Sequence, residues 1–304
     1  MASNGFRGKA DCHRKDRPIR LPRNSVTKGN GMPLSIGKAW DEARAAIAAN
    51  RRLITPVALG LVLVPAVVSA MIEPRAAAGA EPEAGPWMLV TLVMIIVMLA
   101  GQMAIVLLTN GWHGSVGEAI GRAMKRLPTL ILAALMVMVP LVLILSLVLA
   151  VVGLATGADG QFSAASLSPT GWLVVLIGFV IIMAVGVRLL PMIVLIASEE
   201  IGAVAAIRRA FGLTSGHFWK LLAFMLLATI AFLILASAAG AVVGSVVSLL
   251  VGAPEPWSVS LLLLALTAGI VQAAFITVYT AMLTRITAQL EGGQAGVPDV
   301  KRAE

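Results

Sequence analysis

Long apolar stretches alternate along the chain with short polar connections. Six stretches approach or exceed the roughly 20 residues that an α-helix needs to cross the hydrocarbon core of a bilayer. They cover about residues 53–72, 87–109, 129–156, 171–196, 219–251 and 258–284. The pattern predicts an all-α polytopic membrane protein. Its six transmembrane helices fall within a membrane domain at 32–290, and a short polar tail follows at 291–304.

The charges of the connections alternate as well. The segments 73–86, 157–170 and 252–257 carry mainly Asp and Glu, whereas the other connections carry the Lys and Arg residues. Because cytoplasmic loops of membrane proteins are enriched in Lys and Arg, this alternation predicts that both termini lie in the cytoplasm. The prediction is that of a multi-pass protein whose basic connections all face the same side.

The basic connections resemble one another in sequence. Residues 35–40 align with 115–120, and residues 119–124 align with 206–211. These offsets predict a pseudo-threefold repeat, in which one unit is an amphipathic interfacial helix followed by two spans.

Prolines within the spans predict kinks at Pro65, Pro140 and Pro191.

The middle copy shows the expected helix best. Ser115 and Glu118 have the spacing of a capping box, which predicts the start of the helix. The apolar stripe consists of Val116, Ala119, Ile120, Ala123, Met124 and Leu127. The basic face consists of Arg122, Lys125 and Arg126. Such a helix lies in the membrane interface beside anionic headgroups, or it packs against the ends of the bundle, and both interpretations stay open.

The third copy lies in the stretch 199–222. Its expected apolar stripe is Val204, Ile207, Ala210 and Phe211, with Arg208 and Arg209 beside it. We expect the helix to stop near 212–216, and Trp219 with Lys220 to mark the membrane interface. Glu199 and Glu200 are candidates to pair with Arg208 or Arg209.

This stretch resembles the signature of a bacterial six-helix membrane family, which supplies the membrane domain attached to some glycerophosphoryl diester phosphodiesterases. The residues that carry the resemblance are Glu199, Gly202, Ala206, Arg209, Leu213, Thr214, Gly216 and Trp219. The family's usual pattern has Ser-Trp after the arginine, where this chain has Ala210-Phe211. The resemblance implies a six-span fold in the bacterial inner (cytoplasmic) membrane. It implies no established activity for members without the enzyme, whose soluble barrel of about 250 residues has no counterpart here.

Three polar residues interrupt the spans. Arg188 is about 12 Å deep at 1.5 Å per residue, and Gln102 and Gln272 occupy similar places in two other spans. Buried polar groups in a membrane commonly face the bundle interior, so one hypothesis is a cluster on the pseudo-threefold axis that binds an anionic group such as a lipid phosphate. The alternative is that Arg188 reaches the cytoplasmic surface and the glutamines join helices.

In the span 219–251, Gly240 and Gly244 favour close helix packing.

The N-terminal segment 1–31 differs from the rest. It holds eight Lys or Arg against two Asp, and therefore +6 of the net charge of +8. Its composition predicts a disordered basic arm that touches anionic lipid. Alternatively, the chain begins at Met32 and the arm is an upstream translation artefact.

The composition and motifs also restrict the function. Hydrophobic residues make up 59% of the chain and charged residues only 12%, against about 25% in soluble domains. The single Cys12 and the scattered His13, His113 and His217 have no metal-ligand spacing. The sequence thus predicts no enzyme, cofactor, metal or nucleic acid. It predicts a membrane protein with a lipid-interacting or scaffold role, whose partners are anionic lipid or a membrane-associated protein. The alternative is a transporter or lipid-handling permease that uses Arg188.

Overall fold

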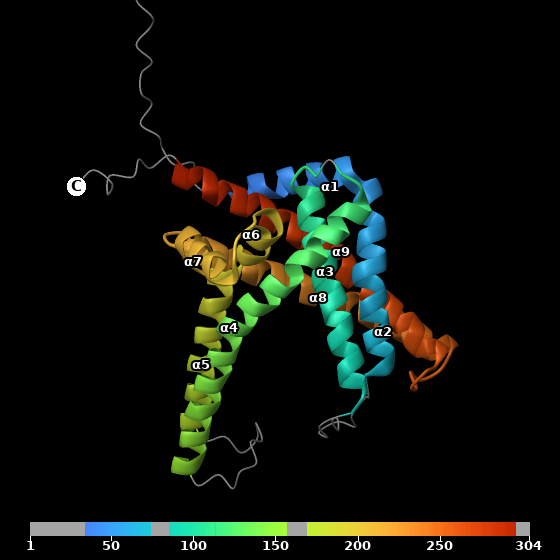
Figure 1. The fold of residues 1–304 in the computed structure, drawn as a ribbon. Helices are drawn as coiled ribbons and strands as arrows, with labels where there is room; N and C mark the ends of the chain where they lie inside the picture. Colours follow the sequence, from blue (N-terminus) through green and yellow to red (C-terminus); the bar gives the residue numbers. More distant parts are fainter. Residues whose placement is uncertain (1–33, 74–84, 113, 157–168, 296–304) are drawn as a thin grey trace, which may run out of the picture.

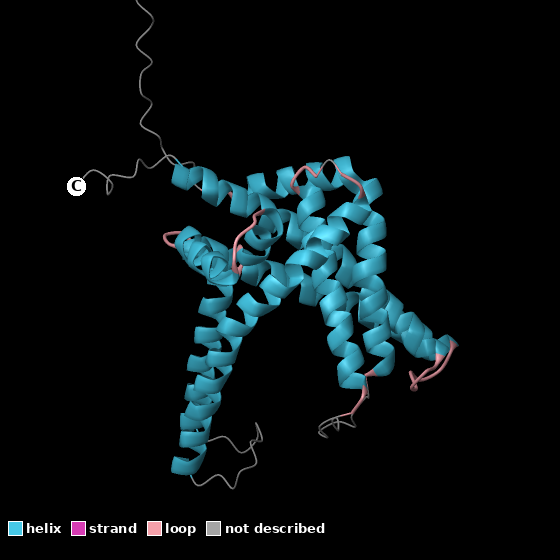
Figure 2. Ribbon diagram, viewed as in Figure 1, coloured by secondary structure: helices cyan, strands magenta, loops and turns pink. Residues whose placement is uncertain are grey.

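The computed structural model describes residues 34–73, 85–112, 114–156 and 169–295. These residues form helices and short connections, and no strand occurs among them (Figure 2). The predicted basic arm at 1–31 and most of the polar tail lie outside the described residues. Six helical segments are long and apolar enough to cross a membrane: Ile36–Ile72, Trp87–Thr109, Val116–Val148, Gly171–Ser198, Phe218–Leu250 and Val259–Gly292. The six predicted spans are confirmed.

The first span is a continuous helix with a local change of winding. It consists of α1 (Ile36–Ala58), the π-helical segment η1 (Leu59–Leu63) and α2 (Val64–Ile72). The Ser35 hydroxyl accepts a hydrogen bond from the Lys38 N–H and caps α1. In Figure 1 the first part of α1 runs across the upper end of the molecule, and the chain then descends to α2. π-helical turns are rare, and they are wider than α-helical turns. The backbone of η1 therefore lies further from the helix axis than the backbone of α1 or α2.

Two helices pack closely against this wider segment. They are α3 (Trp87–Thr109) and α9 (Val259–Ala295), and α8 (Phe218–Leu250) packs along α9. Glycines permit the approach, because a Cβ at Gly101 of α3 would lie 2.8 Å from Leu61 Cβ and 3.1 Å from the Leu61 carbonyl oxygen. A Cβ at Gly269 of α9 would lie 2.7 Å from the Leu63 side chain. These contacts build the tightly packed half of the bundle.

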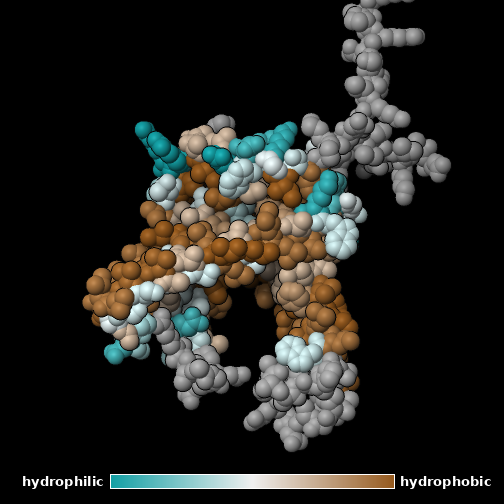
Figure 3. Space-filling view, turned by 180° about the vertical axis from the view of Figure 1, so that it is seen from behind, coloured by the Kyte–Doolittle hydropathy of each residue, from teal (hydrophilic) through white to brown (hydrophobic). Residues whose placement is uncertain are grey.

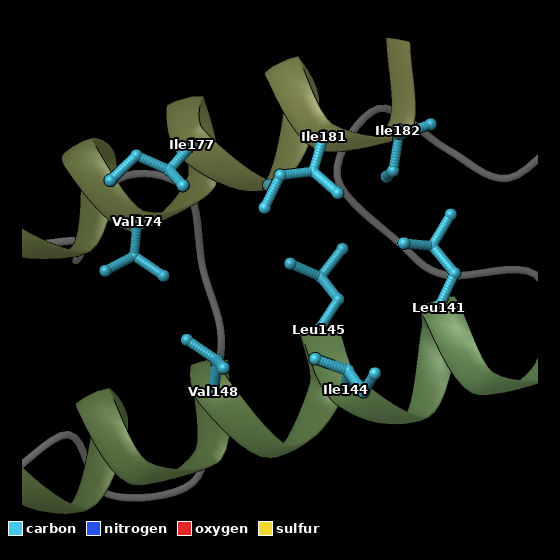
Figure 4. A pocket seen from close by; sticks show the side chains of 9 residues that line it. Leu141, Ile144, Leu145, Val148, Val174, Ile177, Ile181 and Ile182 are labelled. Carbon is cyan, nitrogen blue, oxygen red and sulfur yellow. The ribbon is translucent and has the colours of Figure 1, made fainter. Parts of the chain in front are cut away.

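The other half is an arm of two helices, α4 (Val116–Thr156) and α5 (Pro169–Leu189), which extends away from α2 and α3 in Figure 1. The two helices meet through apolar side chains around a small cavity of about 170 Å³ (Figure 4). Its lining from Leu141 to Ile182 contains no polar side chain. Much of the remaining arm exposes large apolar residues, as expected for helices that face lipid.

Two short helices follow the arm at the same end as the start of α1. The chain breaks at Leu190–Pro191 and continues as α6 (Met192–Ser198) and α7 (Ala203–Thr214). Pro191 therefore marks a real interruption, whereas α4 continues through Pro140. Helix α7 ends as expected, and Gly216 follows it with a φ of +89°, a conformation that glycine adopts at little cost.

The three aligned helices bury the same alanine pairs. Ala39 and Ala43 of α1, Ala119 and Ala123 of α4, and Ala206 and Ala210 of α7 are all fully or almost fully buried. In α1 and α4 this helix is continuous with the following span, whereas α7 is separate. The stripes themselves differ in part from expectation, because Val204 is 48% exposed and Met124 is half exposed. The threefold repeat and the interfacial position of these helices stay predictions.

Candidate functional site: a basic cavity at one end of the bundle

Charge is segregated between the two ends of the bundle. The connections that follow α2 and α8 carry Glu73 and Glu255, with no Lys or Arg among their described residues. We call this the acidic end. The opposite or basic end holds the starts of α1, α4 and α7, and hydrophilic side chains gather at the upper end of Figure 3 above the broad hydrophobic surface.

Helix α4 begins at the basic end with the predicted capping box. The Ser115 hydroxyl accepts from the Glu118 N–H at 3.2 Å, and the Glu118 carboxylate accepts from the Ser115 N–H at 3.3 Å. The indole N–H of Trp112 donates to the Ser115 carbonyl. The helix start is thus fixed by local bonds, and this part of the prediction is confirmed.

Arg126 binds the end of α6. Its Nη1 donates to the Ile196 carbonyl at 3.3 Å and also to the Glu199 carbonyl, and its Nη2 lies 2.8 Å from a Glu200 carboxylate oxygen. Its side chain is only 13% exposed. Its guanidinium thus caps the C-terminal carbonyls of α6, a favourable place for a cation. The expectation that Arg126 faces lipid together with its neighbours on α4 stays a prediction.

An open cavity of about 650 Å³ lies beside this contact, which we call the basic cavity. Its charged and polar lining consists of Glu118, Arg122, Lys125, Arg126, Thr129 and Glu200. Arg122 is 3.8 Å from Glu200 and its guanidinium carbon lies 5.5 Å from the centre of the Trp112 ring. Lys125 has no ion-pair partner in the described part of the chain. The cavity therefore gathers three cations and two exposed carboxylates, those of Glu118 and Glu200.

The motif residues of the stretch 199–222 surround the junction of α6 and α7. Arg209 bridges Glu199 and, at 3.0 Å, Glu291 of α9, which confirms the expected pairing of Glu199 with this arginine. Gly202 precedes α7, while Ala206, Leu213 and Thr214 are buried. Trp219 is 78% exposed, and the Lys220 ammonium donates to the Leu34 carbonyl at 3.4 Å. Most of this motif holds helices together, and Arg208 remains exposed.

One polar contact of this end has no counterpart in the sequence predictions. Arg285 of α9 donates to the carbonyl of Thr109, the last residue of α3, at 2.8 Å. Like Arg126, it places a guanidinium at a helix C-terminus. The only signal in the sequence is a cation just past the last apolar stretch, which does not identify a partner 176 residues away.

The three intramembrane polar residues have different surroundings. Arg188 is half-buried at the end of α5, with its guanidinium carbon 5.6 Å from the centre of the Phe211 ring. The Gln272 amide of α9 donates to the Met98 sulfur of α3 at 3.5 Å, and Gln102 lies one turn further along α3. No hydrogen bond joins Arg188 to either glutamine, all three being described residues. The cluster therefore stays a prediction.

The two glycines of α8 also differ from each other. A Cβ at Gly244 would lie 3.7 Å from the Leu264 side chain of α9, which is ordinary van der Waals contact. A Cβ at Gly240 would meet no atom within 4 Å. The close helix packing expected at this pair is therefore wrong for Gly240, because no neighbouring helix approaches it among the described residues.

The described residues contain no group of His, Cys, Asp and Glu that could hold a metal ion. No family model, curated protein or solved structure matches this chain. The class of protein accordingly rests on the fold and the site: a six-helix, multi-pass membrane protein with a basic cavity at one end.

Proposed function

We propose that this protein is a non-enzymatic integral membrane protein that binds anionic lipid headgroups in the basic cavity. The observation that carries the proposal is the group of Arg122, Lys125 and Arg126 on one open cavity at the end of an apolar bundle. Arginine and lysine beside a membrane surface attract anionic lipid by about 1 kcal/mol per cation. Phosphate oxygens also accept hydrogen bonds from guanidinium groups in a bidentate manner.

The carboxylate of Glu200 lies where such a phosphate would bind. It lies near both Arg122 and Arg126, and its side chain is 83% exposed. The ion pair of Glu200 with the partly exposed Arg122 contributes only about 0–1 kcal/mol, so a headgroup phosphate can replace the carboxylate at this arginine at low cost. Lys125 supplies a further cation that no acid of the described residues neutralises.

The location and the family belong to the same proposal. The basic end faces the cytoplasm by the positive-inside rule, and the membrane is the bacterial inner membrane. The chain is a member of the six-helix family that resembles the membrane domain of glycerophosphoryl diester phosphodiesterases. The pairing of Glu199 with Arg209 supports this, since both residues belong to the motif. A membrane-associated protein with an acidic surface is the alternative partner for the same cations.

The combined substitution Arg122→Gln and Lys125→Gln tests the cavity. We expect it to reduce the retention of phosphatidylglycerol, relative to phosphatidylcholine, by about thirtyfold, because two cations near the headgroup are lost at about 1 kcal/mol each. Glu200→Gln should increase the same ratio, since it removes the competing carboxylate. Native mass spectrometry of protein extracted from mixed-lipid nanodiscs measures both ratios.

A matched control removes the same charge elsewhere. Arg51→Gln with Arg52→Gln deletes two exposed cations of α1 that do not line the cavity. If this control lowers the ratio as strongly as the cavity variant, general surface charge and not the cavity binds the lipid. Equal retention of both lipids by the unmodified protein would refute the proposal.

The placement of Arg188 keeps the permease as a second candidate function. A half-buried arginine at the end of a span, held against Phe211, can contact a charged group that enters the bundle. For a permease, we expect Arg188→Leu to abolish lipid transfer between vesicles without lowering the unfolding temperature, and Arg188→Lys to retain part of the transfer. A lowered unfolding temperature with unchanged transfer would show that Arg188 only holds α7 through its contact with the ring, worth about 0.5–2 kcal/mol.

A further inference from the structure

A second polar cavity lies near the acidic end, between α2, α3 and α9. It measures about 280 Å³, and we call it the distal cavity. Its polar lining comes from three helices: Ser69 and Glu73 at the end of α2, Thr91 near the start of α3, and Gln272 in α9. Polar side chains within spans are rare and commonly functional, so their convergence on one cavity requires an explanation.

Two of these groups have unused hydrogen-bonding capacity. The Thr91 hydroxyl oxygen is buried and has no hydrogen-bond partner, although most buried polar atoms are bonded. The Gln272 amide nitrogen donates to the Met98 sulfur, so the amide oxygen remains as an acceptor. Both groups can accept hydrogen bonds from a ligand that carries N–H or O–H donors.

The charge of the cavity indicates which charge a bound ligand carries. Glu73 is the one charged residue of its lining, and it is exposed at the mouth. A cation is therefore favoured in this cavity, just as an anion is favoured at the basic end.

We propose that the distal cavity binds a primary ammonium group, carried by a lipid headgroup or by a free amine. An ammonium has three N–H donors, so it can bind up to three of the acceptors that line the cavity: the carboxylate of Glu73, the hydroxyls of Ser69 and Thr91, and the amide oxygen of Gln272. A hard metal ion fits less well, because it requires about six to eight oxygens, whereas Met94, Met98 and apolar side chains form the rest of the lining. A quaternary ammonium has no N–H group and cannot satisfy these acceptors.

The test compares two lipids that differ in these N–H groups. Nanodiscs with equal amounts of phosphatidylethanolamine and phosphatidylcholine provide both, and native mass spectrometry measures the ratio retained by the extracted full chain. We expect phosphatidylethanolamine to be enriched, and Glu73→Gln or Gln272→Leu to reduce the enrichment by about tenfold, the effect of losing one hydrogen bond to a charged group. Gln102→Leu is the matched control, because Gln102 is a half-buried intramembrane glutamine that does not line the cavity.

Soluble ethanolamine then identifies the source of the ammonium. If the protein in lipid-free detergent gains thermal stability with ethanolamine but not with choline, and Gln272→Leu removes the gain, the cavity accepts free amines. Enrichment of phosphatidylethanolamine without this gain assigns the site to the lipid headgroup. The proposal is overturned if neither primary amine is preferred over its quaternary counterpart, or if Glu73→Gln and Gln272→Leu both leave the preference unchanged.

Discussion

Replacement of Gly101 by alanine is expected to reduce the free energy of unfolding by about 1–3 kcal/mol, the usual effect of overpacking a close contact. The new Cβ would lie 2.8 Å from Leu61 Cβ and 3.1 Å from the Leu61 carbonyl oxygen. Neither atom is the far end of a flexible side chain, so α3 must move away from η1. The unfolding temperature of the detergent-solubilised protein measures the loss.

Two other glycines provide a graded comparison. At Gly269 the nearest atom is a terminal methyl of Leu63, which can rotate away, so Gly269→Ala should have a smaller effect. At Gly240 a Cβ would meet no atom within 4 Å. Gly240→Ala should therefore be neutral, or stabilising by up to about 1 kcal/mol through helix propensity. An unchanged unfolding temperature for Gly101→Ala would contradict the close packing of α3 on η1.

Replacement of Arg126 by glutamine is expected to release the junction of α6 and α7. The guanidinium binds the carbonyls of Ile196 and Glu199 and the carboxylate of Glu200. Its loss leaves partly buried acceptors without a donor, at a cost of about 1.5–3 kcal/mol. We expect a lower unfolding temperature and faster hydrogen exchange of the amides in 195–203, while exchange in α9 stays slow.

Lys125→Gln is the control for this substitution. It removes the same charge from the preceding residue of α4, but Lys125 is exposed and has no ion-pair partner in the described part of the chain. Its effect on stability should stay within about 0.5 kcal/mol, as for most surface changes. Equal effects of the two substitutions would mean that net charge, and not the contacts of Arg126, stabilises the junction.

Interactions that span a few residues could be predicted from particular positions. Ser115 and Glu118 are three residues apart, and their spacing alone indicates the capping box that starts α4. Glu199 and Arg209 are ten residues apart on either side of a glycine, and they form one of the four pairs that the sequence offered. Glu200 pairs with Arg122 and Arg126 of α4 instead. In both local pairs the path of the chain determines which atoms can meet.

Contacts between distant helices could not be predicted in this way. Arg126 and Lys125 both belong to the predicted basic face of α4. Nevertheless, Arg126 caps α6, whereas Lys125 is exposed. Val204 was expected on the buried stripe of α7, but the neighbouring alanines pack inward and leave it exposed. Which side of a helix is buried depends on the helices around it. The spacing of apolar residues indicates this side only approximately, so a residue at the edge of the stripe can be buried or exposed.

The sequence by itself determined the six spans, because the length of an apolar stretch and the thickness of a bilayer are sufficient to establish them. It also determined the segregation of charge, since each connection is short and its composition is read directly. Only the tertiary structure decided that Glu200 meets the cations of α4 in the basic cavity and that Glu73, Thr91 and Gln272 share the distal cavity. Glu200 and Gln272 lie far along the chain from the residues they meet, and the packing of the helices, as at Gly101, sets which groups come together.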